Sequence, residues 1–315
     1  MRACVSSDPD TEDEGRRELD VRVGFGLFAS EDQLGSLLSI AHRVDVEAGQ
    51  VLYHRGAPAT TLFQVVAGTV ELRASDVPTW LVEAGGALGL IDFAHRRSHA
   101  RTAVATGPSR LLALDAAEYR DYLEDNYEVG HRILTQMSAR LVADVIASAD
   151  PAHFLARTND HERSWASAVE IPLVERLIIL SRMPAFVGTS MQALANLAQA
   201  ATERRFAPGD VIASAGTDPG LISLLVEGTV ELEFPNGRVQ RSGRDFVAHL
   251  EELTVGPRST TATSLTEAIV LQLVRDDLID RIEEHFDLAM TLLAFVASVQ
   301  ERVNDATSPG RCRVG

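Results

Sequence analysis

Apolar and polar residues alternate along this chain in short runs typical of β-strands, and glycines separate the runs. Between positions 47 and 72, the apolar runs Val51–Tyr53 and Leu62–Val66 flank a Gly-Ala-Pro turn, and Gly68 leads into another alternating run. The segment between positions 207 and 232 has the same order of runs and turns. Each segment therefore predicts short strands joined by tight turns.

Three glycines indicate that the two segments are copies of one unit. They lie at a constant spacing of 160 residues, which pairs Gly49 with Gly209, Gly56 with Gly216 and Gly68 with Gly228. A glycine at the same place in both copies suggests a backbone position with positive φ, which glycine adopts without strain. The chain is therefore predicted to be an internal duplication.

The hydrophobic period changes to 3.6 residues on either side of these strands. Helices are predicted at Phe28–Ala41, with Ser30 as its N-cap, and at Phe186–Ala200 in the second copy. Longer helices follow the strands at 129–149 and 287–304. Each long helix carries an apolar stripe: Ile133, Met137, Leu141 and Val145 in the first, and Leu292, Phe295, Val299 and Val303 in the second. We expect these stripes to be buried, between the copies or across a homodimer.

About eight strands per copy predict a closed jelly-roll, an arrangement that removes exposed strand edges. The fold class is thus α+β, with two tandem jelly-roll domains each flanked by helices. The rolls are expected near Val44–Asp115 and Phe206–Val274. The expected parts are an acidic, disordered tail (1–22), a first domain (23–149), a linker (150–168), a second domain (169–305) and a short tail (306–315).

The pattern resembles the cyclic-nucleotide-binding domain, the β-roll of catabolite activator proteins, protein kinase A regulatory subunits and cyclic-nucleotide-gated channels. The matching residues are Gly49, Gly56, Phe63, Val65, Gly68 and Val70 in the first copy, and Pro208, Gly209, Gly216, Leu224, Gly228 and Val230 in the second. The resemblance implies a nucleotide ligand, cyclic AMP (cAMP) or cyclic GMP (cGMP). It also implies helices that reposition when the ligand binds.

In that family one cassette holds the ligand: Phe-Gly-Glu-Leu-Ala, followed about eight residues after the Glu by Pro-Arg-x-Ala-Thr. The glutamate accepts a hydrogen bond from the ribose, while the arginine and nearby backbone N–H groups bind the phosphate. By this resemblance the expected ligand-binding residues are Gly86, Ala87, Leu88, Arg97 and Ser98 in the first copy, and Ala248, Arg258, Ser259 and Thr260 in the second.

Both cassettes lack the glutamate. Ala87 and Ala248 are expected at its positions, and alanine cannot accept a hydrogen bond from the ribose. A buried hydroxyl without a partner costs about 1–3 kcal/mol. We therefore expect cAMP to bind weakly or not at all, unless Glu251 or Glu252 replaces the glutamate. The arginines Arg97 and Arg258 could instead serve a retuned pocket for another anion, or pair with acidic side chains.

Composition excludes several other classes of function. The net charge of −16 disfavours nucleic acid as a partner, and the absence of a long apolar run or signal segment predicts a cytoplasmic protein outside the membrane. No catalytic signature is present, so an enzyme is not predicted. His95 and His99 are four residues apart, but no third ligand completes a metal site.

Two functional hypotheses remain. In the first, the protein is a non-enzymatic sensor whose rolls bind a cyclic nucleotide or related anion and signal through the helices to a partner protein. In the second, it is a ligand-free scaffold that uses rigid rolls and apolar helices for interaction or self-association, including a homodimer.

Overall fold

The protein is represented by a computed structural model that describes residues 37, 39–148 and 170–307. The predicted acidic tail, the linker at 150–168 and most of the helix expected at 28–41 lie outside the described residues. So do positions 308–315 of the predicted C-terminal tail.

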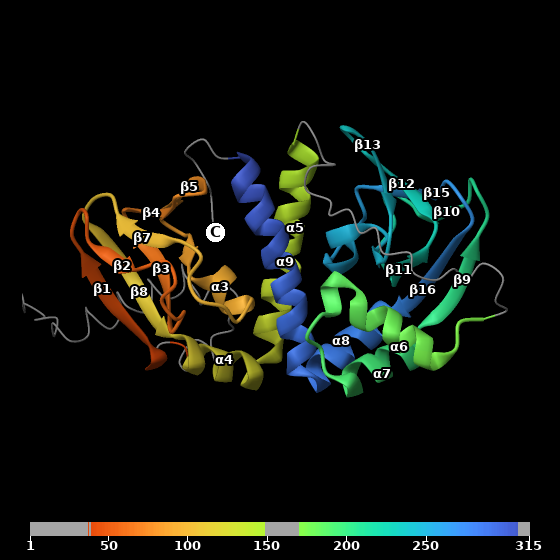
Figure 1. Cartoon of the computed structure of the whole chain (residues 1–315), viewed down its shortest axis with the longest axis horizontal. Coiled ribbons are helices and arrows are strands. Elements are labelled where there is room, and N and C mark those ends of the chain that lie inside the picture. The colour runs from red at the N-terminus through yellow and green to blue at the C-terminus, as the bar shows by residue number, and fades with distance from the viewer. Residues whose placement is uncertain (1–36, 38, 149–169, 308–315) are drawn as a thin grey trace, which may run out of the picture. The chain divides into compact units, whose positions relative to one another are not determined.

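The first roll contains eight strands among the described residues, and they form two four-stranded antiparallel sheets (Figure 1). One sheet has the order β1-β8-β3-β6 and the other β2-β7-β4-β5. The strands are β1 (Ala41–Val46), β2 (Val51–Tyr53), β3 (Thr61–Ala67), β4 (Thr69–Ala74), β5 (Val77–Glu83), β6 (Ala87–Leu88), β7 (Thr102–Ala105) and β8 (Ser109–Asp115), with helix α3 (Leu90–Ala94) between β6 and β7.

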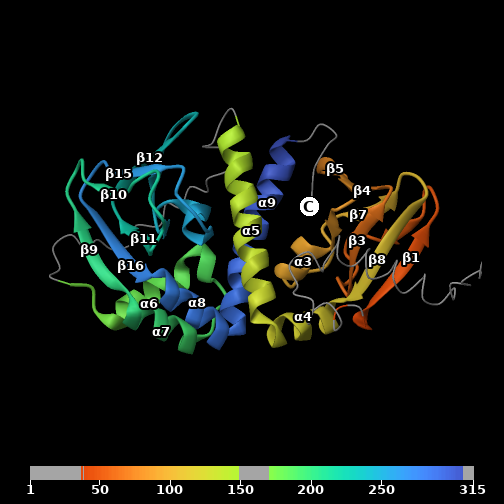
Figure 2. The ribbon, with the colours of Figure 1, turned by 180° about the vertical axis from the view of Figure 1, so that it is seen from behind.

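The second roll repeats this arrangement, as the view from behind in Figure 2 also shows. Its sheets have the orders β9-β16-β11-β14 and β10-β15-β12-β13. The strands are β9 (Thr202–Phe206), β10 (Val211–Ala213), β11 (Leu221–Glu227), β12 (Thr229–Phe234), β13 (Gly237–Ser242), β14 (Asp245–Phe246), β15 (Thr261–Ser264) and β16 (Ala268–Val274). A 3-10 helix, η4 (His249–Leu253), takes the place of α3. The predicted duplication and the predicted pair of jelly-rolls are confirmed.

The first strand of each roll begins earlier than the sequence suggests. Ala41, expected at the end of a helix, pairs with Leu114 in the β1–β8 ladder, so the helix prediction is wrong at that residue. In β1 only the two end residues, Ala41 and Val46, are buried, so the strand has no regular alternation and is recognised only by its pairing with β8. In the second copy the helix prediction is correct, because Ser190 caps α7 (Met191–Ala200) and accepts a hydrogen bond from the Ala193 N–H group.

Gly68 and Gly228 have positive φ angles of 92° and 105°, as the repeated spacing predicts. At each of them there is also no room for a side chain. A Cβ atom on Gly68 would collide with Ser109, and one on Gly228 would lie 2.5 Å from the Glu267 carbonyl oxygen. Both the positive φ and the lack of space for a Cβ atom therefore require glycine at the turn between the two sheets of each roll.

The two rolls differ at one paired position that faces the interior, where the first roll has a valine and the second an arginine. Val70 and Val82 face each other across β4 and β5 in the first core. The corresponding pair in the second roll is Val230 and Arg241. Arg241 is buried and forms an ion pair with Asp245 of β14, which offsets the cost of burying the charge.

The described residues form two compact units, and the boundaries between these units fall within the two long helices. One comprises residues up to Val129 and from Asn304 onward, and the other comprises Gly130–Val303. The helices are α4 (Ala116–Asp125), α5 (Tyr127–Ala147), α6 (Leu173–Arg182), η3 (Pro184–Phe186), α7, α8 (Arg275–Glu284) and α9 (Phe286–Thr307).

Leu141 and Val145 of α5 are buried in the single chain, as are Leu292 and Val299 of α9. The burial of these stripes therefore does not require a second chain.

Candidate functional site

Backbone hydrogen bonds align the two cassettes with each other. In the first roll the N–H group of Gly56 donates to the carbonyl of His99 at 2.8 Å. In the second roll Gly216 donates to the carbonyl of Arg258, also at 2.8 Å. His99 is thus the counterpart of Arg258. The sequence match of Arg97 with Arg258 is displaced by two residues, because it follows residue type and not the backbone of the loop.

The start of the cassette is also shifted relative to the expectation. Gly89 immediately precedes α3, and Ala248 immediately precedes η4, so these two residues are counterparts. Ala87, which was expected to match Ala248, lies two positions earlier in β6 and pairs with Gln64 of β3. Ala87 and Ala248 therefore do not occupy equivalent positions.

The expected ribose position falls on different residues once the register is corrected. The family's glutamate precedes its proline by about eight residues, and the residue eight positions before Pro257 is His249. His249 is the first residue of η4 and Leu90 is the first residue of α3, so Leu90 is its counterpart. Neither residue is a carboxylate. The absence of the glutamate from both copies thus persists after the correction, although other residues stand in its place.

His249 lies in an unusual environment for a histidine. It is buried with a φ of 53°, and Nε2 has no hydrogen-bond partner. Burial lowers the pKa of His249 well below its ordinary value of 6.5, and the nearby positive charges of Arg241 and Arg302 lower it further. The imidazole at this position is therefore neutral near pH 7.

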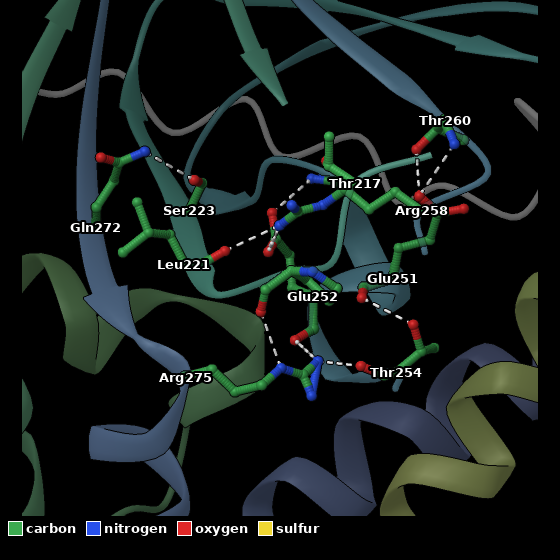
Figure 3. Close-up of polar contacts among 12 residues, drawn as sticks. Thr217, Leu221, Ser223, Glu251, Glu252, Thr254, Arg258, Thr260, Gln272 and Arg275 are labelled. Atoms are coloured by element: carbon green, nitrogen blue, oxygen red, sulfur yellow. Dashed lines mark hydrogen bonds and ion pairs between the residues drawn. The ribbon is translucent and has the colours of Figure 1, made fainter. Parts of the chain in front are cut away.

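The predicted phosphate-binding groups of the second roll converge on a carboxylate of the chain itself. Glu251 is buried and accepts hydrogen bonds from the backbone N–H groups of Ser259 at 3.1 Å and Thr260 at 3.2 Å. The Thr260 hydroxyl also donates to Glu251 (Figure 3). Ser259 and Thr260 are thus brought together as expected, but around an internal anion.

Arg258 is engaged by the adjacent carboxylate. Its Nη2 lies 2.7 Å from Glu252 Oε2 and also donates to the Leu221 carbonyl at 2.9 Å (Figure 3). Glu252 is completely buried. Burial raises the pKa of Glu252, although Arg258 opposes this change. Glu252 therefore serves as an ion-pair partner of the predicted phosphate arginine.

The first roll has a related arrangement with one carboxylate. Asp92 of α3 lies 3.3 Å from His99 Nδ1, and it accepts hydrogen bonds from Arg97 Nε at 2.8 Å and the Ala100 N–H group at 3.3 Å. Burial would raise the pKa of Asp92, but the hydrogen bonds from His99 and Arg97 outweigh it, so the pKa is lowered. The His99 ring stacks on Tyr53 with 3.6 Å between ring centroids.

The remaining predicted residues have mainly structural surroundings. The Gly86 carbonyl accepts a hydrogen bond from Val65, and Leu88 is fully buried in the core of the first roll. Ser98 is exposed and lies beside Arg97 in a cavity next to α4. The sequence did not point to Asp92, His249 or Arg241, and it singled out His99 only as a possible metal ligand together with His95. Only the short spacing of Glu251 and Glu252 before Pro257 indicated the internal carboxylates.

Other kinds of site are not seen in the described part of the chain. Histidine, cysteine and acidic side chains form no cluster there that could hold a metal ion. Among the described helices, none is long and apolar enough to cross a membrane.

The model of the cyclic nucleotide-binding domain family matches residues 43–126 and 203–285, together more than half of the chain. A search of curated proteins gives no match. Similar solved structures include the cAMP-bound regulatory domain of Toxoplasma gondii protein kinase A, with 15% identity, coverage of 92% of this chain and 97% of that chain, and a TM-score of 0.34.

Two further structures are similar over different extents. The regulatory subunit of a cAMP-independent protein kinase A from Trypanosoma brucei is 17% identical, with 96% and 92% of the two chains covered and a TM-score of 0.33. The N-terminal domain of a transcriptional regulator from Streptomyces coelicolor A3(2) is 30% identical over 42% of this chain and 99% of that domain, with a TM-score of 0.36. With both rolls matched by the family model, the chain belongs to the cyclic nucleotide-binding domain family, and carries two such domains in tandem.

Proposed function

We propose that this protein is a non-enzymatic regulatory protein whose second roll keeps its anion-binding groups in contact with the chain's own carboxylates. In this role the second roll binds cAMP and cGMP weakly or not at all. The helices that flank the rolls carry the signal to a partner protein. We also expect a cytoplasmic location.

The observation that supports this proposal is that two glutamates contact the anion-binding groups of the second cassette. Glu251 accepts the hydrogen bonds of Ser259 and Thr260, while Glu252 pairs with Arg258. A cyclic phosphate would need the same donors. Because Glu251 and Glu252 belong to the same chain, they compete with any ligand at a high effective concentration.

Displacing these carboxylates is also unfavourable in itself. Glu251 and Glu252 are both buried, and a buried carboxylate separated from its partners leaves an uncompensated charge. A ligand with a single negative charge would have to replace the lost contacts and supply the free energy of the chain rearrangement that moves a glutamate out of the interior. An ordinary cyclic nucleotide is therefore a poor competitor.

The first roll favours the alternative of a ligand-free scaffold. The position equivalent to Arg258 is His99, which already contacts Asp92 at 3.3 Å. A neutral or hydrogen-bonded imidazole is a weaker anchor for a phosphate than a bidentate guanidinium. In this second candidate function, both rolls act as rigid modules, and the helices provide the surface for a partner or for a homodimer.

The decisive comparison is between Glu251→Ala and Glu233→Ala. Glu251→Ala leaves the buried N–H and hydroxyl groups of Thr260 and the part-buried N–H group of Ser259 without this acceptor. A buried donor without a partner costs about 1–3 kcal/mol, so the melting temperature should fall clearly. Glu233 is exposed and paired with Arg238, so Glu233→Ala should change stability by less than about 1 kcal/mol. Millimolar sulfate should then stabilise Glu251→Ala more than the unmodified protein, because the anion can bind the vacated donors.

Calorimetry with cAMP and cGMP separates the two candidates from an ordinary nucleotide sensor. We expect no saturable heat from the unmodified protein with either nucleotide. Sub-micromolar binding that Arg258→Ala abolishes would contradict the proposal. A signal to a partner protein, in contrast to a passive scaffold, would appear as a change in partner affinity between the unmodified protein and Glu251→Ala.

A further inference from the structure

A cavity of about 500 Å³ lies on the first unit, between the β2–β3 loop, α3 and the start of α4. Its lining includes Ala59, Phe93, Arg96, Arg97, Ala116 and Arg120. Sites for small molecules usually have volumes of about 300–1,000 Å³. The cavity is therefore large enough for a small organic anion.

The second unit fills the equivalent place with an arginine side chain. The N–H group of Ala116 donates to the carbonyl of Thr60 at 2.9 Å, and that of Arg275 donates to the carbonyl of Gly220 at 3.0 Å. These matching bonds make Ala116 the counterpart of Arg275. The first unit thus has a methyl group at a position where the second unit has a long, charged side chain.

Arg275 bridges the two walls of that place. Its Nε donates to the Pro219 carbonyl at 3.0 Å, and its Nη2 donates to the Glu252 carbonyl at 3.1 Å and to the Thr254 carbonyl (Figure 3). Pro219 and Glu252 correspond to Ala59 and Phe93, which line the cavity of the first unit. The cavity is therefore the space that an arginine at position 116 would occupy.

The cavity is lined by three arginines, whereas the equivalent place in the second unit holds the guanidinium of Arg275. Arg96, Arg97 and Arg120 all line the cavity, whereas the residues 159 positions later are Val255, Gly256 and Ile279. Arg120 lies near Arg96, and burial together with that neighbouring charge lowers the pKa of Arg120, although Glu124 and Asp121 oppose this change. Two guanidinium groups held near each other repel, and an anion placed between them relieves the repulsion.

The acidic residues of the lining are already engaged. Asp92 accepts the hydrogen bond of Arg97 and contacts His99. Asp115 caps α4 by accepting from the N–H groups of Ala117 and Glu118. Because both carboxylates accept hydrogen bonds from other groups, they do not compete with an external anion for Arg96. Thr60 and Ser98 also line the cavity, and a hydroxyl group can donate a further hydrogen bond.

We propose that this cavity is a binding site for a phosphate group, either inorganic phosphate or the phosphate of a small organic monoester. Arg96 and Arg120 bind the phosphate oxygens, and Arg97, fixed by Asp92, adds positive charge at the rim. Phe93, Ala59 and Ala116 provide an apolar wall for an organic substituent. The site lies outside the contacts of Glu251 and Glu252, so it is independent of the proposed function.

The test uses the full-length protein, titrated in a calorimeter at constant ionic strength with inorganic phosphate, adenosine 5′-monophosphate or adenosine. Ala116→Arg copies the residue of the second unit and fills the cavity. Because this change adds a positive charge, long-range attraction for phosphate would increase. If Ala116→Arg keeps its melting temperature, a loss of binding therefore results from occupation of the cavity.

We expect saturable binding of phosphate, its loss in Ala116→Arg, and a decrease of roughly tenfold or more in Arg96→Gln and Arg120→Gln. Arg238→Gln, at an exposed arginine of the second unit, should bind as the unmodified protein does. Tighter binding of the monophosphate than of phosphate, with none of adenosine, would identify an organic monoester. Binding that is absent, or unchanged in Ala116→Arg and in both glutamine variants, would overturn the proposal. Melting temperatures of all variants show whether each one is folded.

Discussion

His99 takes in the first roll the backbone position that Arg258 takes in the second, and each is held by a carboxylate. His99 Nδ1 lies 3.3 Å from Asp92, while Arg258 Nη2 lies 2.7 Å from Glu252. The two rolls thus share a buried polar pair at the centre of the cassette, but only the second pair contains a permanent positive charge. The two sites should therefore respond differently to mutation.

Breaking the Arg258–Glu252 pair from one side should be costly. Arg258→Met leaves Glu252 buried without its cation, and such a change typically costs about 3–5 kcal/mol. The double variant Glu252→Gln with Arg258→Met should recover a large part of this loss, because neither member of the pair is then a buried charge. Denaturant unfolding measures the free energy of unfolding, and Arg238→Met supplies an exposed control. Equal stability of the single and double variants would show that Glu252 is not charged in the fold.

His249 should make the second unit sensitive to mild acid. Its folded pKa lies well below the ordinary value of 6.5, so the unfolded chain takes up a proton first as the pH falls. The stability that His249 contributes is complete above about pH 6.5 and is lost as the pH falls towards the folded pKa. His249→Asn should flatten the decline in melting temperature between pH 7 and 5, because asparagine does not take up a proton in this range. Asparagine is the chosen substitute because it tolerates a positive φ. His54→Asn, at an exposed position, should leave that decline as it is in the unmodified protein.

The corrected register predicts which substitutions create affinity for cAMP. Leu90→Glu combined with His99→Arg supplies a carboxylate at the expected ribose position and a guanidinium at the expected phosphate position of the first roll. We expect this pair to raise the affinity for cAMP by roughly tenfold or more, the value of one or two charge-assisted hydrogen bonds. Ala87→Glu is the matched control, because Ala87 lies in β6 opposite Gln64. Calorimetry in which Ala87→Glu gains more affinity than the pair would show that the register is wrong.

The apolar stripe of α5 should be essential for folding of a single chain. Leu141 is fully buried and Val145 is 4% exposed. Leu141→Glu with Val145→Glu should therefore cost several kcal/mol through buried charge without a partner. Ala143→Glu, at an exposed position of the same helix, should have little effect. Circular dichroism follows the loss of structure, and light scattering on the unmodified protein shows whether it is also a homodimer.

The sequence by itself determined the duplication and the two rolls. Gly68 and Gly228 could be recognised because a turn with positive φ favours glycine, and this requirement is local. The strands could be recognised because alternation along a strand follows directly from the geometry of a two-sided sheet. These features depend on neighbours in the chain.

Only the tertiary structure decided how the cassettes are occupied. Arg97 resembles Arg258 in residue type, yet the hydrogen bond from Gly56 gives that position to His99. That register depends on contacts between segments more than forty residues apart, which no local pattern encodes. The same holds for Glu251, which the 3-10 turn of η4 directs towards Ser259 and Thr260. It holds also for the cavity beside Ala116, because its volume results from the length of one side chain packed against a distant loop.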